Sequence, residues 1–256
     1  MIMLAIARQT VREALRRRVM WIFLICGVFL ITLGPVFGFL SPKDQTTILT
    51  SLGLAAILLA GLFITIVTCI YLIPTEIERR TIYTVLSKPV QRYEFVLGKF
   101  LGGFATVFVN IFAMGVVFLG MLWVVVGKAP SVAMVQGVVL TFFQMMLLAA
   151  LTIFFSTFAT PVVNFFLSFG IFLVGNLSSV TESLTTNKNV LVSGIGRLIH
   201  YTLPNFGNFN IQNQLIHPEV VIGSQTRFIE QNIIYAIIYS LVLLVLAILI
   251  FDRREV

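Results

Sequence analysis

Few residues of this 256-residue chain could carry out covalent or metal chemistry. The two histidines, His200 and His217, have no clustered cysteines or carboxylates beside them, so we expect surface or interfacial residues, with a pH-sensitive gate as the alternative. The two cysteines, Cys26 and Cys69, fall in apolar stretches and offer neither a disulfide framework nor a metal site. We therefore predict that the chain holds no metal.

The sequence also lacks the residue combinations that enzymatic catalysis needs. A hydrolase working inside a membrane needs a nucleophile with a base, and Ser156 and Ser168 have no histidine or lysine partner in the sequence around them. The phosphate-binding pattern G-x-x-x-x-G-K-[ST] does not occur, because neither of the two Gly-Lys pairs is followed by Ser or Thr. We predict no catalytic residue, and any nucleotide should be handled by another polypeptide.

Charge, by contrast, is concentrated in one internal stretch. EIERRTIYTVLSKPVQRYEFVLGKF, residues 76–100, holds three acidic and five basic residues between two almost purely apolar segments. Pro74 ends or bends the preceding helix, and Thr75 and Glu78 have the spacing of a capping box. The pattern predicts that a new helix begins at this point.

The helix predicted in this stretch should be interrupted near its middle. Ser87-Lys88-Pro89 interrupts the predicted helix, because the residue before a proline is disfavoured in helical conformation. A second short helix over Val90–Phe95 should lead into the next apolar segment. The sequence thus predicts an elbow, residues 74–95, made of helix, break and helix. On periodicity alone, a solvated connector that only orients the chain is an equal alternative.

The elements around the elbow are predicted from hydropathy. The chain is 59% hydrophobic and 11% charged, with a mean hydropathy of +1.03, which is typical of a membrane protein. Windows of about 20 uncharged apolar residues cross ~30 Å of hydrocarbon as helices, so we predict an all-α fold with six spans. The spans are Val19–Leu40, Ser51–Ile73, Phe100–Val126, Val132–Phe158, Val162–Val180 and Asn232–Phe251.

The N-terminal segment, residues 1–18, should form an amphipathic helix on the membrane surface. Its apolar stripe comprises Leu4, Ala7, Val11, Ala14 and Leu15, and its basic stripe comprises Arg8, Arg12 and Arg16. The apolar run that follows lacks a small-residue cleavage site before Ser41, so we expect a retained span rather than a secretory signal.

Basic residues predict the orientation. With six spans, the termini and the elbow share one side, and twelve of the seventeen Lys and Arg residues fall there. The positive-inside rule makes that side cytoplasmic, so we expect a multi-pass protein of the plasma (inner) membrane with both termini inside. This topology and attraction to an anionic lipid bilayer account for the net charge of +7, so no nucleic acid partner is needed.

The order of residues in the elbow resembles the signature of membrane permeases of the type-2 ABC exporter family. The matching stretch extends to Gly103, and one departure is Arg80, where many members have glycine. The matching positions are Glu76, Glu78, Thr81, Leu86, Ser87, Pro89, Val90, Arg92, Glu94, Val96, Leu97, Gly98 and Lys99.

The resemblance implies that the elbow is a coupling helix docked on a separate cytoplasmic ABC ATPase, which would bind ATP and Mg²⁺. It also implies that residues 1–18 form a connecting helix beside the ATPase, with Arg8, Arg12 and Arg16 on it. The implied contacts with the ATPase are Glu76, Glu78, Arg79, Arg80, Thr81, Leu86, Lys88, Pro89, Arg92 and Tyr93.

Six spans in one permease domain, residues 1–256, make half of a usual exporter. We therefore expect a second permease subunit, identical or related, flanking the pathway. In the resembling family, the loop over residues 181–231 carries short interfacial or re-entrant helices that close the outer end of the pathway.

The predicted spans contain no charged residue, which argues against ion-coupled transport. The polar residues at depth either join helices or contact substrate. The pathway candidates are Thr65, Thr68, Asn110 and Asn164, and further polar residues are Gln144, Ser168 and Asn176. Uncharged walls suit a hydrophobic, amphipathic or lipid-linked substrate. The alternative function is a non-transporting membrane anchor or mechanotransmitter that couples a cytoplasmic ATPase to an envelope process.

Overall fold

The regular elements of the computed structural model are all helical in the part of the chain that it describes, which is residues 2–38, 45–78, 91–127, 129–177, 193–194, 197, 203–210 and 225–253. The all-α prediction is confirmed. The helices are α1 (Ile2–Arg16), α2 (Arg18–Gly38), α3 (Gln45–Cys69), α4 (Pro74–Glu78), α6 (Arg92–Val126), α7 (Val132–Ser156), α8 (Pro161–Asn176), the 3₁₀ helix η2 (Phe206–Phe209) and α12 (Gln225–Arg253).

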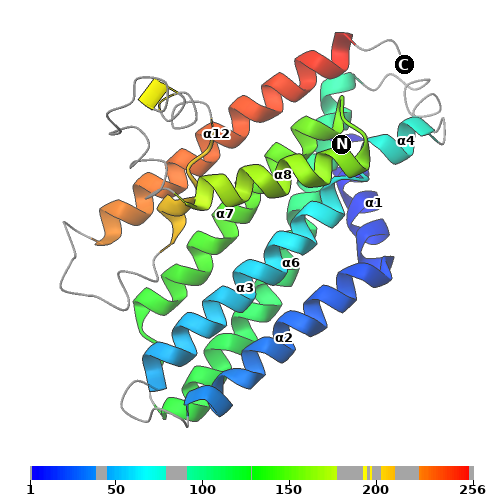
Figure 1. The fold of residues 1–256 in the computed structure, drawn as a ribbon. Coiled ribbons are helices and arrows are strands. Elements are labelled where there is room, and N and C mark those ends of the chain that lie inside the picture. The colour runs from blue at the N-terminus through cyan, green and yellow to red at the C-terminus, as the bar shows by residue number, and fades with distance from the viewer. Residues whose placement is uncertain are drawn as a thin grey trace.

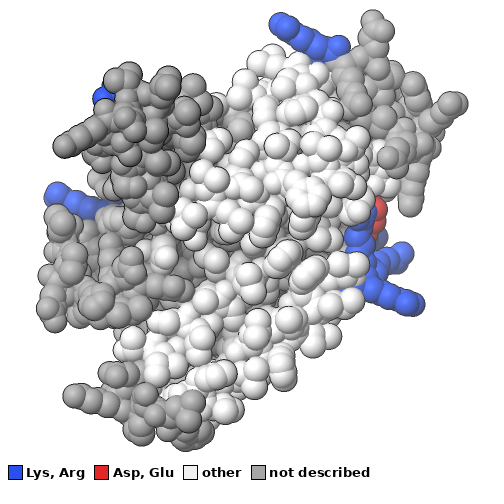
Figure 2. All heavy atoms as spheres, in the orientation of Figure 1, with Lys and Arg blue, Asp and Glu red and all other residues white. Residues whose placement is uncertain are grey.

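The long helices form one bundle (Figure 1). α3 and α7 are the most buried of them, α2 packs on α3, and α12 packs on α7. The core between them is built from Leu, Ile, Phe and Ala side chains. On the face seen in Figure 2, Lys and Arg lie at the periphery, and the described surface between them carries no charge.

In the part of the chain that the structure describes, five helices are long and apolar enough to cross a membrane: α2, α3, α6, α7 and α12. They match five of the six predicted spans, so this is a multi-pass membrane protein. The remaining predicted span, Val162–Val180, corresponds to α8, which has only 16 residues. At ~1.5 Å per residue, α8 is about 24 Å long. α8 ends at Asn176, and another segment packs closely against its last turn, because a Cβ added at Gly175 would overlap the Pro204 carbonyl oxygen.

The two flanks of the elbow also differ from the prediction. α4 begins at Pro74, a residue suited to the first helical turn. α6 runs without interruption for 35 residues from Arg92, so the separate short helix predicted over Val90–Phe95 is wrong. Its start is set by the backbone N–H of Gln91, which donates to Glu94 Oε2 at 3.3 Å.

Several elements meet at one end of the bundle. α1, α4, the first turns of α6 and the last turn of α12 lie together there (Figure 1). We call this region the elbow end. The turn between α6 and α7 lies at the opposite end of the bundle.

Candidate functional site

The predicted ATPase-contact residues lie partly outside the described structure. Arg79, Arg80, Thr81, Leu86, Lys88 and Pro89 fall in residues 79–90, which are outside the described residues. The structure places Glu76 and Glu78 on α4, and Arg92 and the exposed Tyr93 at the start of α6. It therefore describes how the two flanks of the elbow are held.

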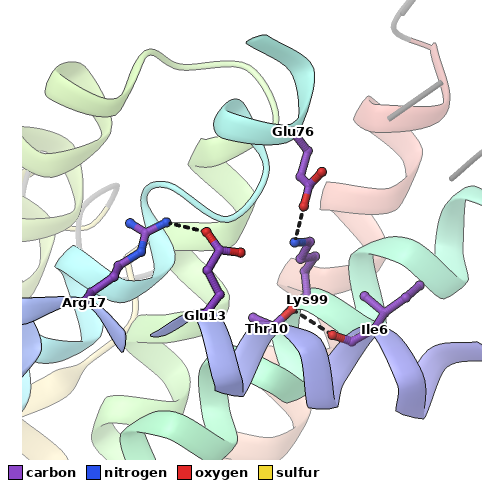
Figure 3. A network of polar contacts seen from close by, with 6 residues as sticks. All are labelled: Ile6, Thr10, Glu13, Arg17, Glu76 and Lys99. Carbon is purple, nitrogen blue, oxygen red and sulfur yellow. Dashed lines mark hydrogen bonds and ion pairs between the residues drawn. The ribbon is translucent and has the colours of Figure 1, made fainter. Parts of the chain in front are cut away.

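A buried ion pair joins those flanks. Lys99 Nζ lies 2.8 Å from Glu76 Oε1, and the two side chains are only 4% and 17% exposed (Figure 3). The ammonium group also lies 5.7 Å from the centre of the Phe95 ring. Because Glu76 precedes the elbow break and Lys99 follows it, the pair ties α4 to α6.

Lys99 was predicted as one of the basic residues facing the cytoplasm and as a position that matches the family signature, and its burial was missed. A buried charge is costly unless it is paired, so the presence of Lys99 in the core depends on Glu76. The only sequence signal was the opposite sign of the two residues at opposite ends of the charged stretch. They lie too far apart for helical periodicity to connect them.

α1 crosses α6 at two glycines one helical turn apart. A Cβ added at Gly102 would lie 2.5 Å from Thr10 Cβ, and one at Gly98 would lie 2.9 Å from Ile6 Cβ. The missing side chains let the two backbones approach closely, as in other small-x-x-x-small helix contacts. The spacing G-K-F-L-G was visible in the sequence, although we had not predicted a partner for it.

The buried face of α1 differs from the predicted apolar stripe. Leu4, assigned to that stripe, is 66% exposed, whereas Thr10 and Ala14 are buried. Thr10 can be buried because its hydroxyl donates to the Ile6 carbonyl at 2.9 Å. The predicted connecting-helix residues, Arg8, Arg12 and Arg16, are all exposed.

Arg92 links the elbow to the end of α12. Its Nη1 donates to the carbonyl oxygens of Phe251 at 3.2 Å and Asp252 at 2.8 Å. The Phe95 and Phe251 rings stack beside it, 5.9 Å apart. The last carbonyls of a helix lack intrahelical partners and carry partial negative charge, so the guanidinium caps α12.

Arg17 ties the corner between α1 and α2 to the turn that follows α3. Its Nη2 lies 3.0 Å from Glu13 Oε1, and its guanidinium lies 5.4 Å from the centre of the Tyr71 ring. Figure 3 shows Arg17 and Glu13 on one side of α1, with Glu76 and Lys99 close by. Through these contacts, α1, α4, α6 and α12 are linked around the elbow.

The four predicted pathway residues are all buried, and the structure places them on three helices: Thr65 and Thr68 on α3, Asn110 on α6 and Asn164 on α8. Asn164 Nδ2 on α8 donates to the Thr152 carbonyl of α7 at 3.0 Å. Asn110 Nδ2 donates to the Thr106 carbonyl at 2.8 Å within α6. Thr65 Oγ1 has no hydrogen-bond partner among the described residues. The Asn164 contact joins α8 to α7, which favours the helix-joining interpretation for that residue. Asn110 Nδ2 also donates to Met20 Sδ of α2 at 3.5 Å, but Asn110 Oδ1, like Thr65 Oγ1, has no hydrogen-bond partner among the described residues. Thr68 is buried on α3.

A second polar contact lies far from the elbow. Gln144 Nε2, at the middle of α7, donates to the Phe206 carbonyl of η2 at 3.1 Å. The Asn205 backbone N–H donates to the Tyr235 hydroxyl of α12 at 2.9 Å. η2 therefore packs against the middle of the bundle. His200 and His217 lie outside the described residues, and the residues that are described contain no group of three or more potential metal ligands.

Comparison with known proteins agrees with this architecture. A family model described as "ABC-2 family transporter protein" matches residues 4–256. A search of curated proteins gave no match. The family match includes the elbow, its flanks and all the long helices. It confirms the resemblance found in the charged stretch, and the chain belongs to the ABC-2 family of transporter proteins.

Proposed function

We propose that the chain is the permease subunit of an ATP-driven exporter that moves a hydrophobic, amphipathic or lipid-linked substrate out of the cytoplasm. Membership of the ABC-2 family supports the transport role and implies an ABC ATPase as partner. The sequence lacks the P-loop motif, so ATP and Mg²⁺ bind to that partner.

The chain crosses the plasma (inner) membrane six times in this proposal, with α8 as the short fifth crossing. Both termini and the elbow face the cytoplasm. Two observations support this topology: α1 and the last turn of α12 lie at the same end of the bundle (Figure 1), and most basic residues of the sequence fall on that side.

The elbow receives the movement of the ATPase and passes it to the bundle. The ATPase docks on residues 79–90, with Arg8, Arg12 and Arg16 of α1 beside it as the connecting helix. The Glu76–Lys99 pair is the observation that carries this proposal, because it makes the two flanks of the docking segment move together. α6 then transmits the movement to α1 through Gly98 and Gly102, and to α12 through Arg92.

Two permease subunits, identical or related, flank the pathway. Thr65, Thr68, Asn110 and Asn164 are the polar groups nearest to a substrate in this arrangement. Thr65 and Asn110 are the strongest of the four, because Thr65 Oγ1 and Asn110 Oδ1 are buried without a hydrogen-bond partner among the described residues and are available to a ligand.

The test is reconstitution of the permease with its ABC ATPase into vesicles, using a fluorescent phospholipid and an amphipathic dye as probes. Wild type should move a probe when ATP is added. Lys99→Met should still bind the ATPase but move the probe several-fold more slowly, because the flanks are no longer joined. Stimulated ATP hydrolysis without movement of either probe would instead favour the mechanotransmitter, and equal transport by Lys99→Met would contradict the coupling role of the ion pair.

A further inference from the structure

A cavity of about 370 Å³ opens at the elbow end between α2, α3 and α8. Its walls are almost entirely apolar. They are formed by Val19, Val67, Ile70, Tyr71, Pro161, Val162, Phe165 and Phe166. Val19 is in the first turn of α2, and Pro161 and Val162 begin α8, so the cavity lies where these helices meet the membrane surface.

The cavity opens onto exposed apolar surface of α8, which is the fifth crossing in the proposed topology. Val162 and Phe166 are 67% and 66% exposed, although both line it. Apolar side chains this exposed on a membrane helix contact hydrocarbon chains. A lipid acyl chain can therefore reach the cavity from the side without crossing a polar layer.

The rim of the cavity is basic. The guanidinium of Arg17 lies 5.4 Å from the centre of the Tyr71 ring, which lines the cavity. Arg17 uses Nη2 for Glu13, which leaves other N–H donors of the same group for a further anion. Arg16 and Arg18 are exposed and have no acidic partner among the described residues. Arg18 directly precedes Val19 of the cavity wall.

We propose that this cavity binds one acyl chain of an anionic membrane phospholipid, with the lipid phosphate held by Arg17 and Arg18. An apolar slot beside a cluster of arginines at the membrane surface matches the two parts of such a lipid. A second copy of the chain or an uncharged ligand could cover the apolar wall, but would leave the arginines without a counter-charge. The site does not depend on the direction of transport or on the ATPase.

The test uses the full chain, delipidated in detergent and examined by native mass spectrometry with added phosphatidylglycerol or phosphatidylcholine. Wild type should retain one phosphatidylglycerol in preference to phosphatidylcholine. Arg17→Gln and Arg18→Gln should each lower phosphatidylglycerol retention about 5-fold. Each basic residue near an anionic lipid surface contributes about 1 kcal/mol to binding, which corresponds to this change. Retention of phosphatidylcholine should change little.

The apolar half of the site is tested separately. Val162→Trp fills the cavity and should lower the retention of both lipids, whereas Val245→Trp on the exposed face of α12 should not. The control for charge is Arg253→Gln, which removes an exposed basic residue at the end of α12. Equal retention of the two lipids by wild type, or an equal loss in Arg253→Gln, would overturn the proposal. A change in dimer mass instead of lipid count in Val162→Trp would make the cavity an interface between copies.

Discussion

At the scale of single residues, the Glu76–Lys99 pair is asymmetric. Lys99 is the more deeply buried partner, whereas Glu76 retains some access to water. If Glu76 is removed, an ammonium group stays in an apolar environment without its counter-ion. If Lys99 is removed, the remaining carboxylate can still be hydrated or protonated. The two residues should therefore respond differently to substitution.

We predict that Glu76→Gln lowers the stability of the chain more than Lys99→Met. Breaking a buried pair by removing one partner costs about 3–5 kcal/mol, and Glu76→Gln should lie in this range. Lys99→Met should cost less, because methionine fills the same space without a charge. Thermal unfolding in detergent measures both.

The matched control is Glu13→Gln, which removes the more exposed pair between Glu13 of α1 and Arg17 at the corner that follows α1. A pair of this kind contributes roughly 0–1 kcal/mol. If Glu76→Gln were no more destabilising than Glu13→Gln, the ion pair would not hold the flanks of the elbow together.

At the scale of elements, hydropathy predicted the long helices well. The predicted span over Val132–Phe158 and the observed α7 begin at the same residue, because the apolar run and the helix coincide. The early end of α8 could not be predicted in this way. The helix ends beside Gly175, against which the distant Pro204 and Phe206 pack. Contacts with distant segments, such as those of Lys99 and Arg92, are likewise invisible to local periodicity.

We predict that Gly102→Leu separates α1 from α6. The added side chain meets Thr10 Cβ and the Ala7 carbonyl oxygen, 2.5 and 2.8 Å from the new Cβ, so α1 must move away. Faster proteolysis of the N-terminal segment and a lower melting temperature would report the separation. Gly120→Leu is the control on the same helix, because nothing lies within 4 Å of its added Cβ. Equal protease resistance of both variants would contradict the close crossing.

At the scale of the whole molecule, the proposed topology places the elbow end in the cytoplasm. We predict that Ser131→Cys, at the start of α7, reacts with a membrane-impermeant thiol reagent in intact cells. Arg12→Cys, on the exposed face of α1, should react only after the cells are opened. Both positions are exposed, so a difference between them reports the side of the membrane. Cys26→Ala provides the background, because Cys26 is the exposed native cysteine. The reverse pattern of labelling would invert the orientation.

The central claim is that the charged elbow is a docking surface for an ATPase, and co-purification of that ATPase tests it most directly. Reversing Arg79 and Arg80 to Glu changes the charge of the elbow without altering any apolar helix. Contacts between like charges across an interface can cost several kcal/mol of binding free energy. Little ATPase should therefore co-purify with the double variant, above all at low salt. Arg227→Glu, near the start of α12, should recover as much ATPase as wild type. Undiminished recovery with the Arg79→Glu/Arg80→Glu variant would contradict the account and leave the elbow as a solvated connector.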